Sequence, residues 1–326
     1  MVHYLYNNIL KNKIQVKSLY KLTKIWYNKD NNMDEVKEFG GYQSPKDERD
    51  FKREDLGTAI IPQHPISWIG DISNIPVYNQ QHQPSCSGHA GSSLIGILSN
   101  NGIILSPRFV YALCKKIDGI PDQEGTYGRT IMQVLQKYGV CTDALFPNDT
   151  SLSWVDYKDY TKIPPRAYTD ALNRRIGAYA QLTDLSFEGI KNAIYNHKVV
   201  LILARIGKEW WTSQSGVNSW KPEDILPLRP PAQIVSGHFF VDYGYDQFYM
   251  DLRNSWGEDW ANKGDGIYKD NYSPYIIEAW VADLPTPPPA PTITVNPTPQ
   301  QIKTWTDNLL EWLSNISQWI KGRLIK

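Results

Sequence analysis

The chain has 326 residues, with 34 basic and 34 acidic side chains and a formal net charge of zero. A neutral balance gives no reason to expect nucleic acid as the main ligand. The 12 Trp and 20 Tyr indicate a chain that is globular over most of its length. No run approaches the ~18 consecutive apolar residues that span a bilayer, and three cysteines do not make a disulfide framework.

Residues 1–40 form a basic N-terminal extension, and Met33 opens a new composition, so it is a possible true start. The extension contains neither an apolar core nor a small-residue cleavage site, which argues against a Sec signal. We therefore expect a protein that is cytoplasmic or is released without such a signal. Residues 41–60 are charged and are expected to wrap the surface.

The next part of the chain predicts helices. A polar loop over 80–85 contains Pro84, and Ser85 or Cys86 then caps a helix that runs to about Ser99. Small and apolar residues around its circumference are typical of a buried helix. Further helices are expected over 106–116, 130–138 and 187–196.

From residue 199 onward the pattern changes to strands. They are expected over 199–204, 239–243, 248–253, 266–269 and 276–281. Helices first and strands later favour an α+β fold with two halves that meet at a cleft. The folded domain is expected to span 41–284.

Two segments follow the folded domain. Residues 285–300 form a proline-rich linker, and 301–326 predict an amphipathic helix with one apolar, tryptophan-rich stripe. Such a stripe is unfavourable in water. It can be buried on the chain's own domain, by self-association, by a partner or by a membrane surface.

A thiol, an imidazole and an amide occur in the order of a cysteine-nucleophile acyl-transfer site. Cys86 is followed 152 residues later by His238, and Asn254 comes 16 residues after that. A cysteine at a helix N-terminus is stabilised as thiolate, and an imidazolium partner adds to the effect. His238 can serve as base and acid, and Asn254 can orient its ring.

Gln80 lies six residues before Cys86. Its side-chain amide and the backbone N–H of Cys86 are candidate donors to a tetrahedral oxyanion.

These motifs resemble the papain-like cysteine peptidase family, in particular its bacterial or phage-type members. The resemblance covers about residues 41–284. Its most specific part is a Gly-His pair placed sixteen residues before the Asn of an Asn-Ser-Trp-Gly run. The matching stretches are Asn79-Gln80, Ser85-Cys86, Leu105-Ser106-Pro107-Arg108-Phe109, Glu124-Gly125-Thr126, Tyr138-Gly139-Val140, Ile225-Leu226-Pro227-Leu228, Gly237-His238, Tyr243-Gly244-Tyr245 and Asn254-Ser255-Trp256-Gly257.

The resemblance implies a two-lobed fold, with a helical lobe, an antiparallel β-barrel-like lobe and an active-site cleft between them. It implies that Cys86 is the nucleophile, His238 the base and acid, Asn254 the orienting residue and Gln80 the oxyanion-hole residue. Trp256 would shield the His–Asn hydrogen bond. The residues that it places along the substrate are Glu124, Gly125, Thr126, Gly237, Phe239 and Trp256.

The sequence departs from the family pattern at several positions. Ser87 replaces an aromatic residue after the nucleophile, and Gln83 replaces a cysteine that pairs in many secreted members. No long helical prosegment is visible, which leaves control by a removable inhibitory propeptide in doubt. Phe239 follows the histidine where a small residue is usual, so it either narrows a substrate pocket toward small or medium apolar side chains or turns into the β core.

The leading hypothesis is a cysteine endopeptidase that hydrolyses peptide bonds through a Cys86 thioester, without cofactor or metal. An acyltransferase or ligase using the same thioester and a non-catalytic peptide-binding module are the alternatives. We expect His89 to be a buried, hydrogen-bonded residue, and Cys114 and Cys141 to be small buried hydrophobes. No Cys/His cluster has zinc spacing.

Overall fold

The computed structural model describes residues 40–48, 50–53, 63–207, 210 and 234–285, and three residues of the C-terminal segment. Those three, Asp307, Leu310 and Ser314, are helical and exposed. The predicted N-terminal extension, the proline-rich linker beyond Pro285 and the rest of the C-terminal helix lie outside the described residues. In the part of the chain that is described, no helix is long and apolar enough to cross a membrane.

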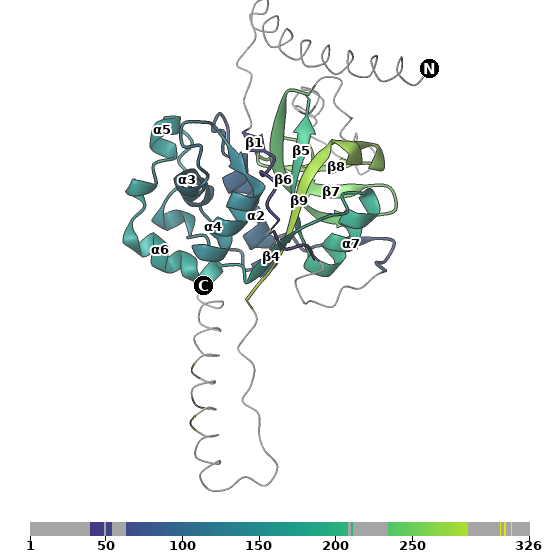
Figure 1. The fold of residues 1–326 in the computed structure, drawn as a ribbon, viewed down its shortest axis with the longest axis horizontal. Helices are drawn as coiled ribbons and strands as arrows, with labels where there is room; N and C mark the ends of the chain where they lie inside the picture. Colours follow the sequence, from purple (N-terminus) through teal and green to yellow (C-terminus); the bar gives the residue numbers. More distant parts are fainter. Residues whose placement is uncertain are drawn as a thin grey trace, which may run out of the picture. The chain divides into compact units, whose positions relative to one another are not determined.

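The first half of the folded domain is helical (Figure 1). Ser106 caps α3, its hydroxyl accepting the backbone N–H of Phe109, with Pro107 as first residue. Buried α2 packs against α3, α4 and the sheet, which agrees with its small and apolar composition. The helices are α2 (Cys86–Ser99), α3 (Pro107–Ile117), α4 (Gly128–Lys137), α5 (Trp154–Tyr157) and α6 (Pro165–Ala171), with short 3₁₀ turns η2 (Asp143–Leu145), η3 (Tyr160–Lys162) and η4 (Leu172–Arg174).

The second half is an antiparallel sheet with strand order β4-β9-β5-β6-β7-β8, and β2 pairs with β6 off this path. No pairing joins β8 to β4 among the described strands, so the sheet is open and does not close into a barrel. Helix α7 (Phe187–His197) packs on β5, β6 and β9. The strands are β2 (Trp68–Ile69), β4 (Ala178–Gln181), β5 (Val200–Ile206), β6 (Ser236–Tyr245), β7 (Met250–Arg253), β8 (Asp265–Tyr268) and β9 (Ile276–Asp283), and η6 (Asp270–Tyr275) precedes β9.

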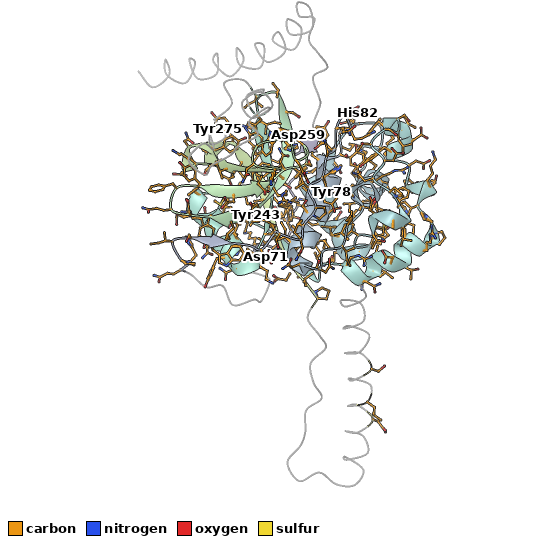
Figure 2. The ribbon with its side chains drawn as sticks, turned by 180° about the vertical axis from the view of Figure 1, so that it is seen from behind. Asp71, Tyr78, His82, Tyr243, Asp259 and Tyr275 are labelled. Carbon is orange, nitrogen blue, oxygen red and sulfur yellow. The ribbon has the colours of Figure 1, made fainter. Side chains whose placement is uncertain are left out.

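Strand β6 separates two hydrophobic cores. Phe239 and Val241 belong to the core shared with the helices, whereas Phe240 belongs to the core inside the sheet half. The alternation follows from the two-residue period of a strand. Seen from behind, Tyr78 lies between the two halves (Figure 2), and its hydroxyl donates to the carbonyl of Leu105. The α+β fold predicted from the sequence is confirmed.

The segment expected to wrap the surface begins instead between the two halves. Strand β1 (Gly41–Tyr42) pairs in parallel with β3 (Thr126–Tyr127), and β1 also contacts β6. Gly40 and Gly41 are buried. The surface prediction failed here because two glycines offer no side chain to signal burial. We call the described residues 40–48 and 50–53 the N-terminal strap.

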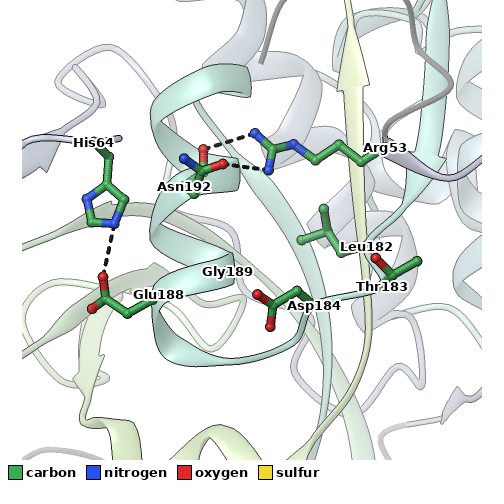
Figure 3. A pocket seen from close by; sticks show the side chains of 8 residues that line it. All are labelled: Arg53, His64, Leu182, Thr183, Asp184, Glu188, Gly189 and Asn192. Carbon is green, nitrogen blue, oxygen red and sulfur yellow. Dashed lines mark hydrogen bonds and ion pairs between the residues drawn. The ribbon is translucent and has the colours of Figure 1, made fainter. Parts of the chain in front are cut away.

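Beyond β1 the strap is fastened along the outside of the domain. Arg129 of α4 forms an ion pair with Asp50, and the backbone N–H of Gln181 in β4 donates to the carbonyl of Phe51 over 2.9 Å. Arg53 then reaches α7, where it donates to the Asn192 side chain over 2.7 Å (Figure 3). The strap is thus held to helices and strands of both halves.

Candidate active site

Cys86 is the first residue of α2 and has no exposed surface. Burial raises the pKa of its thiol to about 12, against the opposing effect of the backbone N–H groups of Phe239, Ser87 and Cys86 itself. The contribution of the Phe239 N–H places the sulfur against β6, beside His238. The helix start and the strand therefore bring together the two residues that the sequence separates.

The hydrogen bonds of Asn254 define the tautomer of the neutral His238 ring. Asn254 Oδ1 accepts the backbone N–H of Ser255 at 2.7 Å, which identifies this atom as the oxygen. His238 Nε2 lies 2.8 Å from the same oxygen and therefore carries a hydrogen. In the neutral ring Nδ1 is then the basic nitrogen. The pair thus has the orientation needed for a base whose far side is held by an amide.

His238 is also fully buried, and burial lowers the pKa of its imidazole to about 4. The hydrogen bond to Asn254 acts in the opposite direction, and nearby His89 lowers the pKa further. Together with the raised pKa of Cys86, this lowered pKa of His238 makes the neutral thiol and the neutral imidazole the stable forms at pH 7 in this structure.

Aromatic rings enclose the histidine. The Trp256 ring lies over His238 at a centroid distance of 4.8 Å, which agrees with the predicted shielding of the His–Asn hydrogen bond. Trp210 adds an edge-on contact at 6.5 Å, and its carbonyl accepts the indole N–H of Trp260. Sequence reasoning missed Trp210, which has no motif around it. The only feature of the sequence that could have indicated it is the Trp210-Trp211 pair, which precedes His238 in the chain.

Gln80 is held by hydrogen bonds in the loop that precedes Cys86. Its side-chain oxygen accepts the Ser255 hydroxyl at 2.7 Å, and its Nε2 donates to the Gln83 carbonyl at 2.8 Å. The backbone N–H of Gln80 donates to the Ser255 carbonyl. An amide nitrogen carries two hydrogens, so one remains for a further acceptor. This geometry is compatible with the predicted oxyanion role.

Of the predicted substrate-side residues, Gly125, Thr126 and Gly237 contact the strap. The backbone N–H of Thr126 donates to the Gly40 carbonyl over 2.8 Å. A Cβ on Gly125 would lie 1.7 Å from that carbonyl oxygen. On the opposite side, a Cβ on Gly237 would lie 2.2 Å from the Gly41 carbonyl oxygen. Glu124 is half-buried at the start of this turn.

The strap itself has glycine where it passes through the site. Gly40 has φ +54°, and a Cβ there would lie 2.5 Å from Gly125. A Cβ on Gly41 would lie 2.6 Å from the Leu203 side chain. The strap therefore fits between Gly125 on one side and Leu203 and Gly237 on the other only because Gly40 and Gly41 lack side chains. Gly237 is the neighbour of the candidate base His238.

A buried carboxylate holds the next part of the strap. Glu278 of β9 has 1% of its surface exposed, and it accepts the backbone N–H of Ser44 at 2.6 Å and the Ser44 hydroxyl at 2.7 Å. The backbone N–H of Arg129 donates to the same hydroxyl. The site is thus closed by main-chain pairing at Gly40 and by polar contacts at Ser44.

The remaining sequence predictions divide as follows. The Phe239 ring is fully buried in the core shared with the helices, so the structure places the ring in the core and only its backbone against Cys86. His89 is buried and bonded to the Ser85 carbonyl, as expected. Cys114 and Cys141 are buried free thiols. No acidic, His or Cys group that could hold a metal occurs among the described residues.

Solved structures similar to this chain are cysteine proteases. Xylellain from Xylella fastidiosa superimposes with a TM-score of 0.63 at 22% identity, over 79% of this chain and 100% of that one. Procathepsin L2 from Tenebrio molitor gives 0.54 at 17% identity, over 85% and 91%. Bromelain from Ananas comosus, bound to the E64 inhibitor, gives 0.51 at 18%, over 68% and 100%.

No protein-family model matches the sequence, and no curated protein matches it either. The structural likenesses show that the chain has the papain-like cysteine peptidase fold.

Proposed function

We propose that this protein is a cysteine endopeptidase that cleaves peptide bonds through a thioester on Cys86. The observation that carries the proposal is the bonding of Asn254 Oδ1, which gives His238 a proton on Nε2 and a basic Nδ1, on the strand whose next backbone N–H, that of Phe239, reaches the Cys86 sulfur.

The chemistry follows from these positions. Cys86 gives its proton to His238 Nδ1, and the sulfur attacks the peptide carbonyl carbon. Gln80 Nε2 and the Cys86 backbone N–H donate to the resulting oxyanion. His238 returns the proton to the leaving amine as the C–N bond breaks. Water, deprotonated by His238, then hydrolyses the thioester and regenerates the thiol.

The strap has to leave the site before substrate enters. It lies against Gly237, the neighbour of His238, and it takes the backbone N–H of Thr126 that an extended peptide would use. Solvent that enters with its departure would hydrate both residues and so favour the thiolate–imidazolium pair. We infer that the closed structure is the inactive form, with the described N-terminal residues as its inhibitor.

A panel of fluorogenic peptides with mass spectrometry of the products tests the proposal on the full chain opened by Gly41→Val, whose Cβ would lie 2.6 Å from the Leu203 side chain. The Gly41→Val/Cys86→Ala double variant is the control. Hydrolysis by the opened protein and none by the double variant supports the proposal. Transfer of the acyl group to an added amine would identify an acyltransferase. Peptide binding without turnover in both proteins would identify a binding module.

A further inference from the structure

Lys115 is a buried cation that the proposed reaction does not use. It lies on α3 with 4% of its surface exposed. Its Nζ donates to Asp118 Oδ2 at 2.7 Å and to three backbone carbonyls, those of Ile120 at 2.8 Å, Gln123 at 2.7 Å and Gly125 at 2.8 Å. An ammonium group has three hydrogens, so four oxygens saturate it.

The last of these carbonyls belongs to the turn that borders the catalytic site. Gly125 is held on both sides of its backbone, because its N–H donates to the Tyr111 hydroxyl at 3.2 Å. Tyr111 and Lys115 are four residues apart on α3 and so share one face of that helix. The Trp154 indole N–H also donates to the Tyr111 hydroxyl, at 2.9 Å.

Fixing Gly125 in this way also fixes the direction of the next backbone N–H. That group belongs to Thr126, and it donates to the strap at Gly40. Gly125 has φ +79°, a conformation that glycine adopts freely and that surrounding contacts have to select. A buried charge is costly unless every partner is satisfied, and a saturated polar network makes its surroundings rigid.

We propose that Lys115 is a positioning residue for the main chain of the peptide in the groove. Its ammonium group holds the 118–125 loop so that Thr126 presents a fixed N–H donor to an extended ligand. In the closed structure that ligand is the strap, and in the open enzyme it is the substrate. The second half of this statement rests on the proposed function, whereas the first half does not.

The test compares Lys115→Met with Lys116→Met in the full chain. Lys116 is the next residue, is exposed and lies over the rings of Tyr138 and Tyr160, so it controls for loss of a charge from α3. Two measurements apply: hydrogen exchange of the Thr126 amide, and the rate at which iodoacetamide labels Cys86. Cys114 and Cys141 serve as internal monitors of unfolding because both are buried.

Lys115→Met should speed Thr126 exchange and Cys86 labelling about tenfold or more, while the other two cysteines stay protected and Lys116→Met matches the parent. Unchanged exchange and labelling in Lys115→Met would overturn the proposal. If that variant labels all three cysteines, Tyr111→Phe decides, since it removes the hydroxyl that accepts the Gly125 and Trp154 N–H groups and leaves the Lys115 charge in place. Faster Thr126 exchange in a folded Tyr111→Phe protein supports the proposal, and parental exchange contradicts it.

In the Gly41→Val background, in which the strap is out of the site, a kinetic measurement separates positioning from general stability. KM for a peptide long enough to pair with Thr126 should rise about tenfold in Lys115→Met, with kcat changed by less than about threefold. A short acyl ester that does not reach Thr126 should be unaffected. Equal losses on both substrates would show that Lys115 only supports the fold. Failure of the opened protein to turn over any substrate would reject the proposed function and leave the exchange and labelling results to decide on Lys115.

Discussion

The Gly41 carbonyl lies directly against Gly237, so that a Cβ on Gly237 would sit 2.2 Å from that oxygen. Gly237 immediately precedes His238, and Gly41 is part of the strap. The strap and the residue before His238 are therefore in contact through two glycines, and we expect one added methyl group on either to disturb this contact.

Replacing Gly41 by valine should open the site. Its Cβ would lie 2.6 Å from the Leu203 side chain and 3.0 Å from Gly237, which forces the strap outward. We expect iodoacetamide to label Cys86 at least about tenfold faster, with Cys114 and Cys141 still protected. Gly96→Ala is the control, because a Cβ there meets Ile75 only at 3.5 Å. A labelling rate equal to that of the parent would show that the strap does not limit access.

The pH dependence of this labelling should differ between closed and open forms. In the closed form burial raises the pKa of Cys86 to about 12 and lowers that of His238 to about 4, so both groups are neutral over the range between. The labelling rate should then climb steadily into alkaline pH. In Gly41→Val, hydration favours the ion pair, and the rate should reach a plateau near neutral pH. Identical profiles in the two proteins would contradict the closed neutral pair.

Asn254→Ala should reduce peptide turnover by about 10–10³-fold, and His238→Ala by more, since the amide orients the ring without transferring a proton. The physical reason is the loss of the 2.8 Å bond to His238 Nε2, which selects the tautomer with a basic Nδ1. Steady-state kinetics on the opened protein measures both. Asn101→Ala, in a turn of the helical half, is the matched control. An Asn254→Ala protein as active as this control would remove the orienting role.

Asp242→Asn should stabilise the fold at neutral and alkaline pH. Asp242 is fully buried in β6 and accepts the Tyr268 hydroxyl, and burial raises the pKa of its carboxyl well above the usual value. The folded state therefore holds the proton more tightly than the unfolded chain. Stability from this group is present at low pH and is lost as pH rises above about 4, the value expected in the unfolded chain. Asparagine keeps the acceptor without the charge.

Urea denaturation at pH 5 and pH 8 measures this effect as the difference between parent and variant. We expect the variant to gain at least about 1 kcal/mol relative to the parent over that interval, which corresponds to less than one pKa unit. Asp246→Asn, at an exposed position after β6, is the control. A constant difference between the two proteins across the interval would refute the raised pKa.

The meeting of the candidate site residues could be predicted from the sequence because the chemistry proposed for them restricts residue type. Cys86 opens a helix with a clear start, and the helix ends at the predicted Ser99. Asn254 and Trp256 belong to one short run, and both contact His238. The strap could not be predicted, since its burial depends on backbone pairing between Gly41 and Thr126, 85 residues apart. Such pairing leaves no periodic signal in either segment.

Other features were hidden for related reasons. Strand β4 has four residues and a mixed pattern, and only its pairing with β9 defines it. Lys115 looks like an ordinary charge near the end of an amphipathic helix. Its burial results from a loop that folds back over the helix, ten residues further along at Gly125. Local propensity determines where elements form, whereas these contacts depend on how distant segments meet.

Ser255 connects the segment that carries Asn254 to the loop that carries Gln80. It donates its N–H to Asn254, accepts the backbone N–H of Gln80 and donates its hydroxyl to the Gln80 side chain. A backbone bridge between Asn79 and Trp256 lies next to it. These bonds tie the loop that carries Gln80 to the segment that carries Asn254. The spacing between the candidate oxyanion donor and the support of the imidazole ring would then stay constant while one peptide in the site is exchanged for another.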